Sequence, residues 1–130
     1  MPPAPFAVVE GAVNVATSDI ENAKIISTRL GYEDHGTFAC RVVLAMGLRE
    51  QAFGDYPLDD CGSTGMIGTV YGCQFLMDLL STVGVDRWEG LCGTYVRVDR
   101  FNGDIRRLGH IIEDRWFDPR ALAERLAKAV

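Results

Sequence analysis

Residues 94–112 have the sequence TYVRVDRFNGDIRRLGHII, and this stretch decides the fold. From Thr94 to Asp99 small or apolar side chains alternate with larger polar ones, which is typical of a strand with one buried face. The Asn102-Gly103 pair is a strong signal for a tight hairpin turn. Ile105 to Ile112 supplies the returning strand, so the stretch predicts an antiparallel hairpin.

Three more strands are predicted upstream of this hairpin. Residues 23–30 are rich in β-branched side chains and end at a glycine-flanked turn over residues 31–36. Residues 37–46 place a strongly apolar set of side chains on one face, as a strand does. Residues 49–53 are long enough for a third, short strand, and an antiparallel meander is the simplest arrangement of the three.

Two helices are predicted, the first after a long loop. Residues 54–68 contain turn-forming residues and almost no periodic apolar signal, so we expect a loop of about fifteen residues there. Thr69 can cap a helix that Gly84 ends. Asp118 is the expected N-cap of a closing helix from Pro119 to about Lys128.

Together these elements predict one α+β domain. A chain of 130 residues is long enough to bury a core without disulfides or metals. The expected architecture is an antiparallel sheet of about five strands packed with two helices. Residues 1–22 hold three of the five prolines and are expected to form an extended arm, either partly disordered or packed along a neighbouring subunit. Residues 23–130 are the expected ligand-binding domain.

The charge balance limits the choice of partner. Asp and Glu number 18 against 13 Lys and Arg, for a net charge of −5, which argues against a duplex nucleic-acid binder. A small anionic ligand needs only two or three arginines and remains compatible. The longest apolar candidate, Val70 to Val83, is too short and too interrupted to span a membrane. The N-terminus lacks the pattern of a secretory signal, so we expect a cytoplasmic protein.

No catalytic or metal motif is present in the sequence. It lacks the signatures of serine hydrolases, zinc proteases and phosphate-binding loops, so we expect no enzyme activity and no cofactor. An Asp34-His35 pair fits either an exposed turn or an acid–base couple. No two of the four cysteines are spaced as C-x-x-C, which favours reduced structural thiols over a zinc site.

The first candidate site is the entrance to the first helix. Gly68, Thr69 and Tyr71 lie where free backbone amides and the positive end of the helix dipole can hold an anion. The alternative is a flexible loop with a threonine N-cap.

The second candidate site is the arginine-rich hairpin. Arg97, Arg106 and Arg107 could hold phosphates, and His110 could contact a ribose or phosphate. Phe101, or Tyr71 at the helix entrance, could stack against a base. Arg97 stands out because an inward arginine on a strand needs an anionic partner or a ligand. The alternative is a solvated hairpin whose charges protect the sheet edge.

The chain also resembles a family of small phage and prophage proteins over residues 24–119. The motifs that carry the resemblance are LGYEDHG (30–36), GDYPLD (54–59), GTVYG (68–72), GVDRWE (84–89), GTYVRV (93–98) and GHIIEDRWFDP (109–119). It is similar to the anti-Thoeris sponge proteins, which capture cyclic ADP-ribose isomers and cyclic oligonucleotides. The resemblance implies a non-catalytic homo-oligomer, a dimer or larger, that sequesters a signalling nucleotide in the bacterial cytoplasm.

Two other functions are compatible with the sequence. One is a protein–protein inhibitor of a host defence complex, similar to an anti-CRISPR protein, although the acidic residues are scattered rather than clustered. The other is binding of single-stranded nucleic acid through the aromatic hairpin, against which the acidic composition counts.

Overall fold

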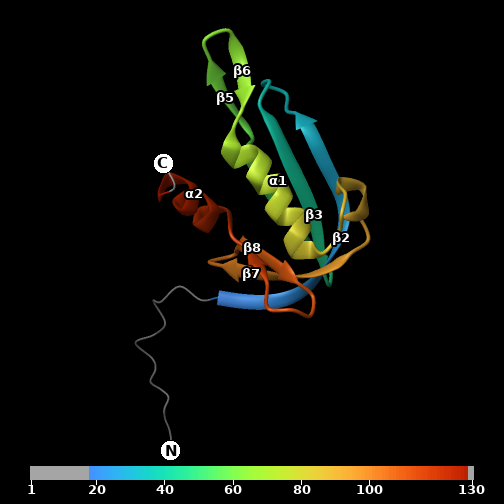
Figure 1. Ribbon diagram of the computed structural model, residues 1–130. Coiled ribbons are helices and arrows are strands. Elements are labelled where there is room, and N and C mark those ends of the chain that lie inside the picture. Colours follow the sequence, from blue (N-terminus) through green and yellow to red (C-terminus); the bar gives the residue numbers. More distant parts are fainter. Residues whose placement is uncertain (1–17, 129–130) are drawn as a thin grey trace, which may run out of the picture.

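The computed structural model describes residues 18–128 (Figure 1). Six strands form one antiparallel sheet in the order β4-β3-β2-β7-β8-β9. They are β2 (Ser18–Tyr32), β3 (Phe38–Met46), β4 (Arg49–Pro57), β7 (Tyr95–Phe101), β8 (Asp104–His110) and β9 (Trp116–Phe117). The other elements are the hairpin of β5 (Asp59–Gly62) and β6 (Gly65–Gly68), the helices α1 (Val70–Val83) and α2 (Pro119–Lys128), and the 3-10 turn η2 (Trp88–Gly90).

Within residues 18–128, this arrangement confirms the predicted α+β fold, in which an antiparallel sheet packs with two helices in a single domain. The main sheet has six strands rather than about five, and β5 and β6 form a second, two-stranded sheet. β2 begins five residues earlier than expected, because residues 18–22 pair with β7. The rest of the expected arm, residues 1–17, lies outside the described residues.

The core lies on one face of the sheet, between the sheet and both helices. α1 and α2 each add buried residues to the same cluster as the strands, so they cover the same face (Figure 1). Aliphatic and aromatic side chains at alternate strand positions are buried, which is the pattern the sequence predicts. The largest fully buried hydrophobic side chains are Ile25, Val42, Leu44, Phe75, Leu79, Leu91, Val96, Val98, Leu108 and Leu122.

The hairpin of β7 and β8 turns at Asn102 and Gly103, which have φ angles of 55° and 89°. Positive φ at both central residues matches the twist of the flanking strands. The hairpin predicted from residues 94–112 is therefore confirmed.

The helix ends also follow the prediction. The Thr69 hydroxyl accepts a hydrogen bond from the backbone N–H of Gly72 at 2.8 Å, and Gly84 ends α1 in the left-handed conformation. The Asp118 carboxylate accepts from the N–H of Arg120 at 2.9 Å at the start of α2. Within residues 18–128 no helix combines the length and apolar character needed to cross a membrane.

The expected loop over residues 54–68 is wrong. β4 continues to Pro57 past a bend at Gly54 and Asp55, which both have positive φ. β5 and β6 then form a hairpin that projects beyond the sheet (Figure 1). β6 is exposed throughout, so its sequence has no buried face and no apolar alternation to reveal it.

The sheet bends so that β4, at one edge, approaches the β7–β8 hairpin, near the other edge, over the core face. The Gln51 side chain of β4 donates to the backbone carbonyl of Gly103 at the tip of the β7–β8 hairpin. On the same face, Glu21 of β2 accepts hydrogen bonds from Arg49 of β4 and Arg100 of β7. These cross-links place β4 opposite β8, and the space between them forms the candidate site.

Candidate ligand-binding cleft

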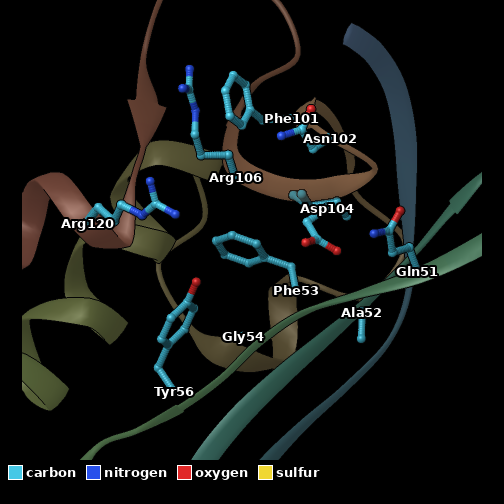
Figure 2. Close-up of a pocket in the computed structure, with 11 residues that line it drawn as sticks. Gln51, Ala52, Phe53, Gly54, Tyr56, Phe101, Asn102, Asp104, Arg106 and Arg120 are labelled. Carbon is cyan, nitrogen blue, oxygen red and sulfur yellow. The ribbon is translucent and has the colours of Figure 1, made fainter. Parts of the chain in front are cut away.

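A cleft of about 440 Å³ lies between β4, the β7–β8 hairpin and the first turn of α2 (Figure 2). Its size is within the range of small-molecule sites. The lining residues are Gln51, Ala52, Phe53, Gly54, Tyr56, Phe101, Asn102, Asp104, Ile105, Arg106 and Arg120.

The cleft separates two strand edges that do not pair with each other. Among the described strands, β4 is an edge strand, bonded only to β3. β9 pairs with β8 only at Leu108 and Gly109, so no strand within residues 18–128 lies beside residues 104–106 on that side. Alternate backbone N–H and C=O groups of an unpaired edge point away from the sheet. The site therefore offers backbone donors and acceptors in addition to its side chains.

Two arginines supply positive charge to the cleft. The Arg106 guanidinium lies 5.0 Å from the centre of the Phe101 ring, and its Nη2 is 3.4 Å from Asp99 Oδ2. Its Nε is buried and has no hydrogen-bond partner among the described residues. Arg120 comes from α2 and makes no side-chain hydrogen bond or ion pair within residues 18–128. Among the described lining residues, Asp104 is the single carboxylate.

Aromatic rings form the apolar part of the cleft. Figure 2 shows the Phe53 ring in the middle of the site, with the Tyr56 hydroxyl directed toward it. Phe53 is buried, whereas Tyr56 is 38% exposed and packs at 5.7 Å on Phe75 of α1. The partly exposed faces of Tyr56 and Phe101 are therefore available to a planar ligand.

Of the predicted hairpin residues, Phe101 and Arg106 lie in the cleft and the other three do not. Arg107 Nε bonds the fully buried carboxylate of Asp99 at 2.7 Å. Arg97 lies on the sheet face opposite the helices, where its guanidinium stacks on Trp116.

The expectation that Arg97 needs an anionic partner or a ligand is wrong. Its Nε donates to the carbonyl of His110 at 2.7 Å and its Nη2 to the carbonyl of Glu113 at 2.8 Å. His110 has a local role as well, because its Nδ1 accepts from the N–H groups of Ile112 and Glu113. These contacts hold the turn that leads into β9.

The predicted helix-entrance residues do not join the cleft. The Thr69 hydroxyl donates to the Leu58 carbonyl at 3.1 Å, and the α1 backbone at Gly72 packs directly against Leu58. Tyr71 packs edge-on against Phe75, and burial raises the pKa of its hydroxyl. Gly68 lies in a separate hollow beside β6. The start of α1 is therefore a packed junction rather than an open anion cradle.

Sequence reasoning missed Arg120, Phe53 and Tyr56. The only local signal for Arg120 is its place in the first turn of a predicted helix, which normally indicates a solvent-exposed residue. Phe53 and Tyr56 lie in or next to the stretch interpreted as a loop. The bending of the sheet brings all three to the hairpin.

Residues 18–128 contain no group of three or more His, Cys, Asp or Glu side chains placed to hold a metal ion. Comparison with models of protein families, with curated proteins and with solved structures finds no match to this chain. The resemblance to phage proteins and to the anti-Thoeris sponges stays a prediction.

Proposed function

We propose that the protein binds and sequesters a small anionic nucleotide in the cleft between β4 and β8, without changing it chemically. The observation that carries the proposal is the pair of guanidinium groups, Arg106 and Arg120, beside an aromatic cleft of about 440 Å³. Arginine is suited to phosphate because its planar fork presents several donors at once.

The charge on Arg106 is available to a ligand. Its contact with Asp99 is long at 3.4 Å, and Arg107 already bonds the same carboxylate oxygen at 2.7 Å. Asp99 therefore keeps a close cationic partner when Arg106 turns toward a phosphate. After this turn, a phosphate oxygen would also reach the Arg106 Nε, which is buried and unpaired within residues 18–128.

The remaining lining residues suit the rest of a nucleotide. Tyr56 and Phe101 offer ring faces for a base. Gln51, Asn102 and Asp104 offer donors and acceptors for a sugar or for base edges.

The sequence resemblance narrows the ligand class to cyclic ADP-ribose isomers and cyclic oligonucleotides. Both combine phosphate groups with planar bases, which suit the arginines and the aromatic rings of the cleft. Capture of such a signal would make the protein a phage-type counter-defence factor that acts by lowering the free concentration of the signal.

A thermal-shift screen of the full chain tests the proposal. The panel contains cyclic ADP-ribose isomers, cyclic dinucleotides, a cyclic trinucleotide and NAD. A true ligand raises the melting temperature by several degrees at saturating concentration and is recovered intact after denaturation. The Arg106→Gln and Arg120→Gln variants should reduce this shift.

Arg87→Gln is the matched control, because Arg87 is an exposed arginine outside the cleft. If no compound of the panel raises the melting temperature, the proposal is overturned. Equal shifts in the cleft variants and in the control would place the ligand elsewhere, and chemical conversion of the ligand would indicate an enzyme.

A second candidate function is binding of a protein partner or of a second copy of the chain. The observation that favours it is a set of exposed apolar side chains on β6 and α1, namely Met66, Ile67, Val70 and Met77, each at least half exposed. Light scattering after gel filtration tests self-association. Met77→Glu should convert any oligomer to a monomer, and a monomeric wild-type protein would exclude the homo-oligomer.

A further inference from the structure

We propose that the outer face of the sheet, opposite the helices, is a second binding surface that takes single-stranded nucleic acid. This surface is separate from the cleft, because Tyr95, Lys24, Arg97 and Trp116 are absent from the cleft lining. Its occupancy is independent of the proposed nucleotide function.

The strand register assembles this surface from four strands. Tyr95 of β7 pairs with Lys24 of β2. In the next row of the same face, Arg97 pairs with Asn22 on one side and with Gly109 on the other, and Gly109 pairs with Trp116 of β9. Paired residues lie on the same face of a sheet. Tyr95, Arg97 and Trp116 therefore lie in two neighbouring rows.

The surface presents rings and cations in contact with each other. Tyr95 is 56% exposed, and the Lys24 ammonium lies 5.6 Å from the centre of its ring. The guanidinium of Arg97 lies 4.8 Å from the centre of the Trp116 ring. Unpaired bases stack on aromatic rings and on guanidinium planes, and this stacking tolerates any base sequence.

The glycine in this row is required by the packing of Trp116. A Cβ atom at Gly109 would lie 2.6 Å from Cε3 of the indole, so no larger residue fits beneath the ring. The indole Nε1 is held by Asp114 at 3.1 Å. The ring is thus fixed against the sheet and positioned before any ligand arrives.

Charge complementarity argues for a nucleic acid as the occupant. Lys24 forms no ion pair among the described residues, and the hydrogen bonds of Arg97 go to backbone carbonyls. Both cations can therefore neutralise phosphates. Two phosphate contacts give modest affinity with a shallow salt dependence, which is compatible with a net charge of −5. Base stacking on the exposed ring of Tyr95 requires unpaired bases, so a single strand fits and a duplex does not.

Fluorescence anisotropy of a labelled oligothymidylate of about 12 nucleotides, titrated with the full chain, tests this inference. We expect binding at about 50 mM salt that weakens at about 200 mM. Tyr95→Ser should weaken binding roughly tenfold. Lys24→Gln should weaken binding and reduce the slope of log K against log salt by about 0.7.

Tyr32→Ser is the matched control, because Tyr32 is 65% exposed at the other end of β2 and lies outside this surface. Absence of binding by the wild-type chain at low salt would overturn the inference. Equal oligonucleotide affinities for the Tyr95→Ser and Tyr32→Ser variants would also overturn the inference. The cleft variants Arg106→Gln and Arg120→Gln should bind the oligonucleotide as the wild type does, so failure of one site is distinguishable from failure of the other.

Discussion

The side-chain amide of Gln51 donates a hydrogen bond to the backbone carbonyl of Gly103 at 2.8 Å and joins β4 to the tip of the β7–β8 hairpin. Replacing Gln51 by Leu keeps most of the side-chain volume and removes this bond. We expect the free energy of unfolding to fall by about 0.5–1.5 kcal/mol, as measured by urea denaturation. Nucleotide affinity should fall as well, because the variant loses both the bond between β4 and the hairpin and an amide group that lines the cleft.

Gln74→Leu is the control for this variant. Gln74 makes a hydrogen bond of similar length, but to Asp78 within α1. The Gln74→Leu variant should lose stability to a similar extent and keep the nucleotide affinity of the wild type. Equal affinities for the Gln51 and Gln74 variants would show that the bond does not shape the cleft.

Gly72→Ala should destabilise the protein, although alanine is the better helix former by about 1 kcal/mol. A Cβ atom at this position would lie 2.3 Å from the backbone oxygen of Leu58, which cannot move aside as a flexible side chain does. Forcing an extra methyl group into such a contact typically costs about 1–3 kcal/mol. Cys73→Ala, at the next and exposed position of the same helix, should change little. A Gly72→Ala variant with raised stability in chemical denaturation would contradict the packing described at this junction.

The Cys40 thiol should be unreactive in the folded protein. Burial raises its pKa to about 12, so almost no thiolate is present at neutral pH. Cys61, Cys73 and Cys92 are exposed. A thiol reagent such as Ellman's should therefore modify three cysteines in the native protein and the fourth only after denaturation. Four thiols reacting in one phase would show that β3 opens readily.

Glu21 should make stability depend on pH in the acid range. The hydrogen bond from Arg49 is the largest cause that lowers its pKa, and Arg100 lowers it further. The folded protein therefore binds fewer protons here than the unfolded chain does. The stabilisation is complete above the ordinary glutamate pKa and is lost as pH falls through the lower folded value.

Denaturation of wild-type and Glu21→Gln proteins over a series of pH values measures this contribution. The variant should be less stable at neutral pH and should lose less stability on acidification. Parallel curves for the two proteins would mean that Glu21 does not contribute to the acid sensitivity.

Much of the fold could be predicted because its signals are local. The Asn102-Gly103 turn, the alternation along β3 and the caps at Thr69 and Gly84 each depend on a few neighbouring residues. The hairpin of β5 and β6 could not be predicted, because exposed strands lack the apolar alternation that reveals buried ones.

The candidate site was predicted only in part, because its residues meet through the bending of the sheet. Phe101 and Arg106 were named from the arginine-rich hairpin. Nothing in the sequence around Arg120 of α2 or around Phe53 of β4 indicates that these residues line a site. The carbonyl of Glu113 that accepts a hydrogen bond from Arg97 lies 16 residues further along the chain, so this contact could not be predicted from the residues around Arg97.

The central strand β2 pairs with two strands, β3 and β7, that are synthesised at very different times. On one side it pairs with β3 after a short turn, whereas on the other side Ser18 pairs with Phe101 of β7. Because a chain emerges from the ribosome N-terminus first, the β2–β3–β4 meander is complete while the other edge of β2 is still open. An open edge is a template for pairing with another chain. The charges of Asp19, Glu21 and Lys24 along β2 would protect the nascent protein from aggregation during this interval.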